Sequence, residues 1–380
     1  MVMLDNMNRK YAYSLDFCKF IASIMILLHH YQQRFTDYLG GDVVFEGIRF
    51  WKGSFNFGYL VEFFFILSGF FIYTGYHRRI IEGMSFSDFW IRRYLRLIPV
   101  AAITCVFYEI TKIIYNCIAG LKWSQSINIW ATIYSAAGIQ EGWGLTNPGI
   151  NGPLWYISVL LICYFFFYLS ETISLRLHIS ETTVFVLFIL IGFAGSTLNA
   201  DLPLLNSRLS RGYSAFFFGV ILGKYYSIRS DVANKKLIIV FCAVVIVVSI
   251  LVFCFANQII GNIRYILLFV FYPAIIILMV MTSNKNGDKK SMFRFWGPLS
   301  YSIYIWQAVL LNVMMIISKL FNLDVYLTRI TTMLLFVVGT VAFSLFSVFI
   351  VEKRVNSFIN ESVQRVKSRE TIDNDISCKK

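Results

Sequence analysis

Long apolar runs, separated by short polar segments, fill most of the chain. A helix that crosses a bilayer needs roughly 20 mostly apolar residues. The pattern therefore predicts an all-α membrane protein, a polytopic bundle of about ten transmembrane helices. The runs extend over Leu15–Phe35, Phe55–Tyr76, Leu97–Cys117, Leu154–Leu169, Thr183–Leu198, Tyr213–Tyr226, Leu237–Phe255, Tyr265–Thr282, Leu299–Ile317 and Ile330–Val351.

The same pattern predicts the domain organisation. Residues 1–352 form one predicted transmembrane domain, and the polar segment 353–380 is predicted to be a cytoplasmic tail. We find no internal repeat of the kind that marks a transporter with two related halves. The first run begins near Leu15 and is long enough to span, and no small-residue cleavage site follows it, so we expect no cleavable signal peptide.

Composition and charge support a place in the membrane. Hydrophobic residues make up 58% of the chain and charged residues 14%, whereas a soluble domain carries roughly 25% charged residues. The net charge of +13 does not indicate a nucleic-acid partner, because 23 of the 34 basic residues fall on the cytoplasmic side when the N-terminus is placed inside. This bias predicts a multi-pass protein of the cytoplasmic membrane with both termini in the cytoplasm. The seven Cys residues show no spacing typical of zinc or of a disulfide framework.

Ionisable residues inside spanning helices are costly and are therefore candidates for function. The first predicted helix holds Lys19 and His30, whose separation corresponds to three turns and roughly 16 Å of rise. These residues share one face, with Lys19 near the cytoplasm and His30 near the outside. Asp16 precedes Lys19 by one turn and can pair with it. Glu62 of the second helix lies at a depth similar to that of His30, so the two can pair if their helices are neighbours.

Simpler interpretations of the polar residues stay open. An intramembrane histidine can serve only as a hydrogen-bonding group between helices. This is the preferred interpretation of His29, which points about 100° away from the next residue. Glu62 can pair with any buried Lys or Arg. The basic cluster before the third apolar run can be a simple anchor at the cytoplasmic surface; it consists of Arg92, Arg93 and Arg96.

Five loose motifs occur in order along the chain. They are Asp16 and Lys19 followed by His30, then Glu62–Phe70 (EFFFILSGF), Phe89–Pro99 (FWIRRYLRLIP), Pro153–Ile157 (PLWYI) and Gly297–Tyr304 (GPLSYSIY). In this combination the chain resembles the membrane-bound acyltransferase-3 family, which O-acetylates sugars of surface polysaccharides and lipid-linked glycans. The resemblance runs from about Leu15 to about Val351.

The resemblance implies roles at the matching positions. His30 would be the family's essential histidine, and Glu62 would be its acidic residue before the Phe-Phe run. Arg92, Arg93 and Arg96 would match its cytoplasmic arginine motif. We therefore expect His30 and Glu62 to be catalytic and the three arginines to bind the donor.

Two positions depart from the family's pattern, and three aromatic residues complete the expected site. The family usually has Arg where this chain has Lys19, and Lys keeps the charge but loses the bidentate fork. It often has Glu where this chain has Leu160, so no carboxylate acts at that point. Lys19 is still expected to help bind the donor. The aromatic residues of the fourth and fifth motifs, Trp155, Tyr301 and Tyr304, are expected to bind substrate.

These features predict transfer of an acetyl or other short acyl group to a glycan hydroxyl. The donor would be acetyl-CoA or another acyl-CoA, whose phosphates suit arginines, and we expect no metal. His30 would act as a base or would carry the acyl group itself. The expected partners are membrane lipid and a glycan or lipid-linked sugar acceptor. The alternatives are a non-catalytic flippase or transporter of lipid-linked glycan and a partner protein in polysaccharide export.

The arginines and His30 are predicted to lie near opposite faces of the membrane, which requires a path between them. A donor whose phosphates stay at the arginines must send its thioester arm into the bundle. Small or polar residues on facing helices would leave room for this arm; candidates are Ser23, Ser68 and Gly69. Only the acyl group would then reach the outer half.

The predicted topology can be tested with a reporter that is active only outside the cytoplasmic membrane. We expect a fusion after Lys380 to be silent and a fusion near Gly142 to be active, because the basic residues favour a cytoplasmic C-terminus. Signals in the opposite order would contradict the topology.

Overall fold

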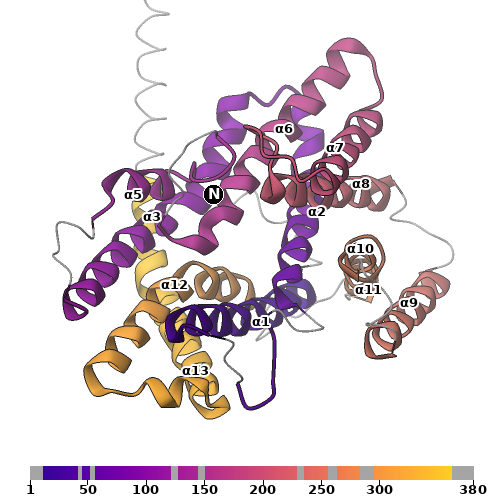
Figure 1. Ribbon diagram of the computed structural model, residues 1–380. Coiled ribbons are helices and arrows are strands. Elements are labelled where there is room, and N and C mark those ends of the chain that lie inside the picture. The colour runs from indigo at the N-terminus through magenta and orange to yellow at the C-terminus, as the bar shows by residue number, and fades with distance from the viewer. Residues whose placement is uncertain are drawn as a thin grey trace, which may run out of the picture.

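The computed structural model describes residues 12–41, 45–51, 56–120, 127–143, 150–228, 235–255, 263–282 and 295–361. These residues form a helical bundle without strands, and only two isolated β-bridges occur among them (Figure 1). The long helices are α1 (Ala12–Leu39), α2 (Leu60–Ile81), α3 (Phe86–Ile118), α6 (Trp155–Leu177), α7 (Glu181–Thr197), α8 (Ser207–Ile228), α9 (Lys235–Phe255), α12 (Trp296–Phe321) and α13 (Ile330–Phe346).

Shorter elements complete or extend these helices. The eighth predicted run is a continuous segment made of α10 (Ile263–Ile266), a π-helical turn (Leu267–Phe271) and α11 (Tyr272–Thr282). A second π-helical turn, Ser347–Glu352, continues α13, and helix extends from there to residue 361. The short helix α5 (Ile129–Ala136) packs against α3.

The predicted all-α membrane bundle is confirmed, and each predicted run coincides with a helix. Among the described residues, seven helical segments are long and apolar enough to cross a bilayer. The remaining three, α1, α7 and α8, are more polar or shorter. The helix α8 begins at Ser207, six residues before the predicted start at Tyr213. Both chain ends, 1–11 and 362–380, lie outside the described residues, so their predicted location stays a prediction.

Burial divides the helices into an inner and an outer set. In the spanning windows of α2, α6 and α12, 56% of residues are buried, against 11% in α9. The helix α9 also has the highest mean hydropathy of these windows, 3.1, and lies at the rim of the bundle (Figure 1). An exposed helix of this kind is stable only where lipid covers it. The inner helices α2, α6 and α12 are therefore shielded from lipid and can hold buried polar side chains.

Glycine brings α2 and α8 unusually close together. A Cβ atom added to Gly69 of α2 would lie 2.0 Å from the carbonyl oxygen of Phe216, and one added to Gly219 of α8 would lie 2.1 Å from that of Ile66. Only glycine fits at these two positions, because the neighbouring atoms belong to rigid helix backbone. Small residues at helix interfaces commonly permit such an approach in membranes. The α2–α8 pair is thus the closest-packed part of the inner bundle.

Replacement of Gly219 by Ala should destabilise the protein, because its new methyl group must push apart two helix backbones. Overpacking of this kind costs about 1–3 kcal/mol. The measurement is thermal unfolding of the purified protein in detergent. Gly339→Ala on α13 is the matched control, since a Cβ there meets nothing within 4 Å. Equal unfolding temperatures for the two variants would contradict the close approach.

Candidate active site

His30 is held in one orientation by α12. Its Nδ1 lies 2.9 Å from Oε1 of Gln307, and the Gln307 amide nitrogen donates to the carbonyl oxygen of Tyr304 at 2.9 Å. Because the amide nitrogen is used in that bond, the amide oxygen faces the histidine and accepts from it. Nδ1 therefore carries the ring hydrogen, and Nε2 keeps a lone pair. Within the described ranges, Nε2 makes no hydrogen bond.

Glu62 lies in the first turn of α2 and is 1% exposed. Arg211 of α8 donates to both of its oxygens, from Nε at 2.8 Å and from Nη2 at 2.9 Å. Arg264 of α10 donates from Nε to Oε1 at 2.8 Å. The possible His30–Glu62 pair does not form, because two guanidinium groups occupy the carboxylate and Gln307 occupies the ring. The simpler interpretation of Glu62, a pair with buried arginine, describes its contacts.

His29 lies beside the ion pair of Glu62 with its arginines. Its Nδ1 lies 3.3 Å from the carbonyl oxygen of Phe50, and its ring packs against Gly58. The carbonyl oxygen of Gly58 also accepts from Arg211 at 2.9 Å. The rings of His29 and His30 meet edge to face, with centroids 5.3 Å apart. The two histidines are therefore neighbours with different partners, as their positions on the helix predicted.

Two arginines of α8 lie over the ring of Trp155. The guanidinium carbons of Arg208 and Arg211 are 5.6 Å and 5.3 Å from the centre of its ring, a distance suited to cation–π attraction. Arg208 also donates to Glu141 at 2.5 Å. The sequence pattern does not identify these arginines as site residues, because the sixth predicted helix begins only at Tyr213. A helix that begins at Ser207 carries both of them on its first turns.

Tyr301 and Tyr304 connect α12 to the rest of the inner bundle. The Tyr301 hydroxyl donates to the carbonyl oxygen of Leu97 at 2.5 Å, and the Tyr304 hydroxyl donates to that of Pro153. Both hydroxyls are therefore engaged with backbone of α3 and of the turn before α6. Their predicted contact with substrate stays a prediction, and the structure assigns each of them a positioning contact.

The three arginines of α3 have different surroundings. Arg93 points into the bundle, where its guanidinium lies 4.1 Å from the Tyr76 ring centre and 5.6 Å from that of Tyr164. Its Nε is buried and has no hydrogen-bond partner among the described residues. Arg96 is exposed and Arg92 is half-buried. The cluster therefore has one inward-facing member, Arg93, which helical spacing alone did not distinguish.

Lys19 occupies the same end of the bundle as the arginines in the predicted topology. Its Nζ donates to Asp16 at 2.8 Å, which confirms the predicted pair, and lies 4.9 Å from the centre of the Phe71 ring. The Asp16 carboxylate packs against Gly297, where an added Cβ would lie 2.8 Å from it. Lys19 and Asp16 thus join α1 to the middle of α2 and to the first turn of α12.

Ser68 is the only one of the three small residues on the expected path whose side chain faces another inner helix. Its hydroxyl lies 3.1 Å from the Tyr156 hydroxyl of α6, and the Tyr156 ring lies 5.6 Å from the Tyr304 ring. Ser23 donates to the carbonyl oxygen of its own helix, at Phe20. Gly69 faces the backbone of α8, so the expectation that it leaves room for the donor is wrong.

A sequence model of a family described as "Acyltransferase domain" matches residues 12–351, nearly the whole transmembrane part. The chain belongs to the acyltransferase-3 family. Comparison with curated proteins and with solved structures found no significant match. Membership agrees with the order of the five motifs and establishes acyl transfer by a membrane protein as the activity of the class.

Leu160 stands at a position where the family often has a glutamate. Leu160 is buried among apolar neighbours of the main core. A carboxylate at this position would need a counter-charge inside the membrane. The position therefore serves packing in this chain.

Proposed function

We propose that this acyltransferase moves an acetyl or other short acyl group from a cytoplasmic acyl-CoA to a hydroxyl of a surface polysaccharide or lipid-linked glycan. The observation that supports the proposal most is the orientation of His30. Gln307 holds its Nδ1–H, and the Nε2 lone pair remains available inside a membrane bundle. A lone pair in this position can accept a proton or attack a carbonyl carbon.

The available Nε2 serves either of two routes. As a base, it takes the proton of the acceptor hydroxyl while the hydroxyl oxygen attacks the thioester carbonyl. The C–S bond then breaks, and the imidazolium returns the proton to the departing thiolate. As a carrier, Nε2 attacks the thioester itself and releases the thiolate; the hydroxyl oxygen then takes the acyl group from Nε2, and the hydroxyl proton goes to the thiolate. Both routes use the same nitrogen and the same neutral partner at Nδ1.

Gln307 differs from the carboxylate of hydrolase triads in one respect. An amide oxygen fixes the tautomer but brings no negative charge, so it stabilises the imidazolium less than a carboxylate does. Glu62 is not available for that purpose, since Arg211 and Arg264 hold it. We infer that Glu62 acts through Arg211, whose position beside Gly58 and Trp155 shapes the outer end of the site.

The donor side of the proposal rests on the arginines of α3. Coenzyme A carries phosphates, and Arg93 offers an unpartnered buried Nε between two tyrosine rings. Arg96 and Lys19 add positive charge near the same end. The thioester arm would then extend inward past Ser68 and Tyr156 towards His30. Roughly 16 Å of helix rise separates the levels of Lys19 and His30, so the acyl group crosses while the phosphates stay inside.

His30→Ala should abolish acyl transfer without loss of membrane insertion, and His29→Ala should keep much of it, because His30 stands at the family's motif position and is the histidine whose tautomer Gln307 fixes. Gln307→Ala should lower turnover roughly 10-fold or more through loss of the tautomer, whereas Gln307→Glu should restore part of it by accepting the same hydrogen. The measurement is transfer of radiolabelled acetyl from acetyl-CoA in membrane vesicles. Full activity of His30→Ala would exclude this chemistry and favour a non-catalytic role in glycan export.

The arginines should differ in their effect on the donor. Arg93→Ala should raise the apparent KM for acetyl-CoA more than Arg92→Ala, because only Arg93 faces the bundle interior. Arg93→Lys should rescue only in part, since it loses the bidentate geometry and the flat stacking surface. Steady-state kinetics in vesicles measures the difference. Complete rescue by lysine at all three positions would show that the cluster is only a membrane anchor.

A further inference from the structure

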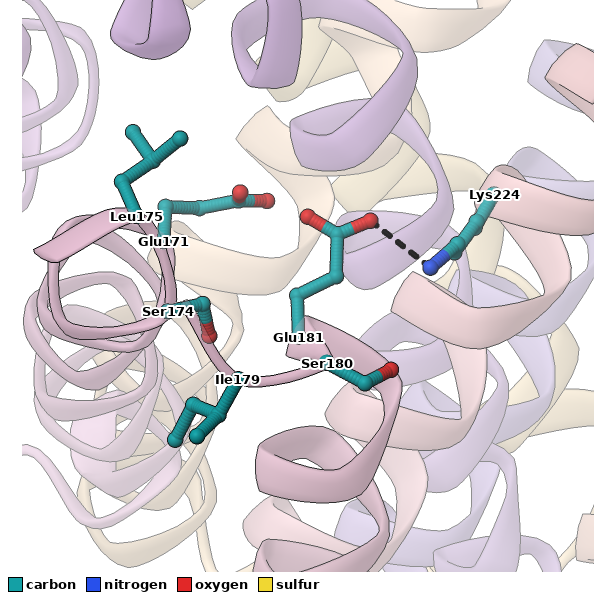
Figure 2. Close-up of a pocket in the computed structure, with 7 residues that line it drawn as sticks. All are labelled: Glu171, Ser174, Leu175, Ile179, Ser180, Glu181 and Lys224. Carbon is teal, nitrogen blue, oxygen red and sulfur yellow. Dashed lines mark ion pairs between the residues drawn. The ribbon is translucent and has the colours of Figure 1, made fainter. Parts of the chain in front are cut away.

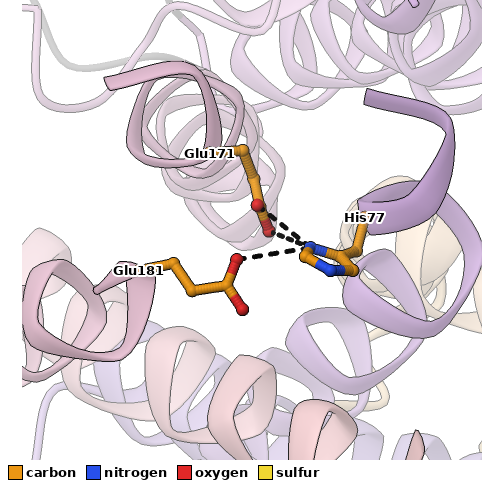
Figure 3. Close-up of side chains that lie close together, drawn as sticks. All are labelled: His77, Glu171 and Glu181. Atoms are coloured by element: carbon orange, nitrogen blue, oxygen red, sulfur yellow. Dashed lines mark hydrogen bonds and ion pairs between the residues drawn. The ribbon is translucent and has the colours of Figure 1, made fainter. Parts of the chain in front are cut away.

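A second cluster of ionisable side chains lies away from His30, where the α6–α7 connection meets α2 and α8. It consists of His77 at the end of α2, Glu171 of α6 and Glu181 in the first turn of α7 (Figure 3). The imidazole of His77 faces both carboxylates. Glu171 is 1% exposed, although it is an ionisable residue within a spanning helix. The acyl-transfer chemistry described above uses none of these residues.

The three side chains converge through atoms that are otherwise free to coordinate. Nδ1 of His77 lies 3.0 Å from each oxygen of Glu171 and 3.4 Å from Oε2 of Glu181. Nδ1 carries at most one hydrogen, but three carboxylate oxygens lie close to it. Two ionised carboxylates beside one imidazole repel, and either a shared proton or a bound cation relieves that repulsion.

The separations fit a small transition-metal ion. Zinc binds nitrogen and carboxylate oxygen at about 2.0–2.2 Å in tetrahedral geometry, which places neighbouring ligand atoms roughly 3.3 Å apart. The His77–Glu171 and His77–Glu181 separations lie on either side of that value. A nitrogen and two carboxylates from three different helices form a ligand set that zinc accepts.

Oε1 of Glu181, the oxygen that is not closest to His77, has partners of its own. Lys224 of α8 contacts Oε1 at 2.8 Å, and the Tyr73 hydroxyl donates to Oε1 at 3.1 Å. Lys224 also donates to the Thr182 hydroxyl at 2.7 Å, which keeps the ammonium group on the far side of the carboxylate (Figure 2). Oε2 is thereby left to face His77. Supporting hydrogen bonds of this kind orient metal ligands in proteins.

A pocket of about 200 Å³ opens beside the cluster and is lined by Glu171, Glu181 and Lys224 together with Ser174 (Figure 2). The Ser174 side chain is 7% exposed, and its hydroxyl has no hydrogen-bond partner among the described residues. A buried hydroxyl on the wall of a polar pocket indicates a missing partner such as a metal-bound water. The pocket would supply the fourth coordination position.

We propose that His77, Glu171 and Glu181 bind a divalent transition-metal ion, zinc in the first place, with a pocket water as fourth ligand. The site is independent of the acyl-transfer proposal. It differs from the expectation from sequence that no metal is bound, which considered only local spacing. Bound metal would join α2, α6 and α7 and would stabilise the folded bundle through mass action. Binding requires Nδ1 of His77 to be free of its hydrogen, so affinity should fall as pH is lowered.

The test uses the full-length protein purified in detergent, stripped with a chelator and then titrated with zinc. We expect about one tightly bound zinc per chain by elemental analysis, and a visible absorption spectrum typical of tetrahedral coordination when cobalt replaces zinc. Glu171→Gln and His77→Gln should each weaken zinc binding by at least 10-fold, and Tyr73→Phe by roughly 10-fold through loss of its supporting bond.

Glu82→Gln is the matched control, because Glu82 lies just after α2 but pairs only with exposed Arg78. It should bind zinc as the unaltered protein does. If Glu171→Gln does not fold, Glu181→Gln takes its place. The proposal is overturned if the unaltered protein binds no zinc after titration, or if zinc binds equally well to the unaltered protein and to the His77 and Glu171 variants.

Discussion

The inner bundle depends on the neutralisation of one buried carboxylate. Glu62 is 1% exposed within a spanning helix, and an unpaired charge there would cost several kcal/mol. Arg211 and Arg264 supply the opposite charge from α8 and α10. This ion pair can form only if α8 lies close to α2, and Gly69 and Gly219 permit that approach. The closest approach of two helix backbones and the burial of Glu62 therefore occur in the same helix pair.

The ion pair also determines what the neighbouring residues can do. Because Arg211 is held by Glu62, its guanidinium lies over Trp155 and against Gly58, next to the histidines of α1. With the carboxylate already occupied, the orientation of His30 depends on a neutral amide from α12. This part of the bundle thus separates charge neutralisation from histidine orientation, two functions that a single carboxylate performs in hydrolase triads.

A different arrangement of charges occupies the end of α2 beyond Tyr73. There two carboxylates face one imidazole, and Lys224 neutralises only one of them from the far side. Aromatic and hydroxyl side chains lie between the two polar regions, as in the Ser68–Tyr156 contact. The inner helices therefore carry polar groups at both ends and aromatic rings between them.

The sequence by itself determined the membrane class, the position of the helices and the local pair of Asp16 with Lys19, because apolar length and helical spacing act within one segment. The family motifs likewise pointed to His30 and to the arginines of α3. Only the tertiary structure decided that Gln307 orients His30, that Arg211 takes Glu62 and that His77 meets two glutamates. These partners lie up to 277 positions apart in the chain, and which of several buried polar groups meet depends on how closely whole helices pack, which no single segment encodes.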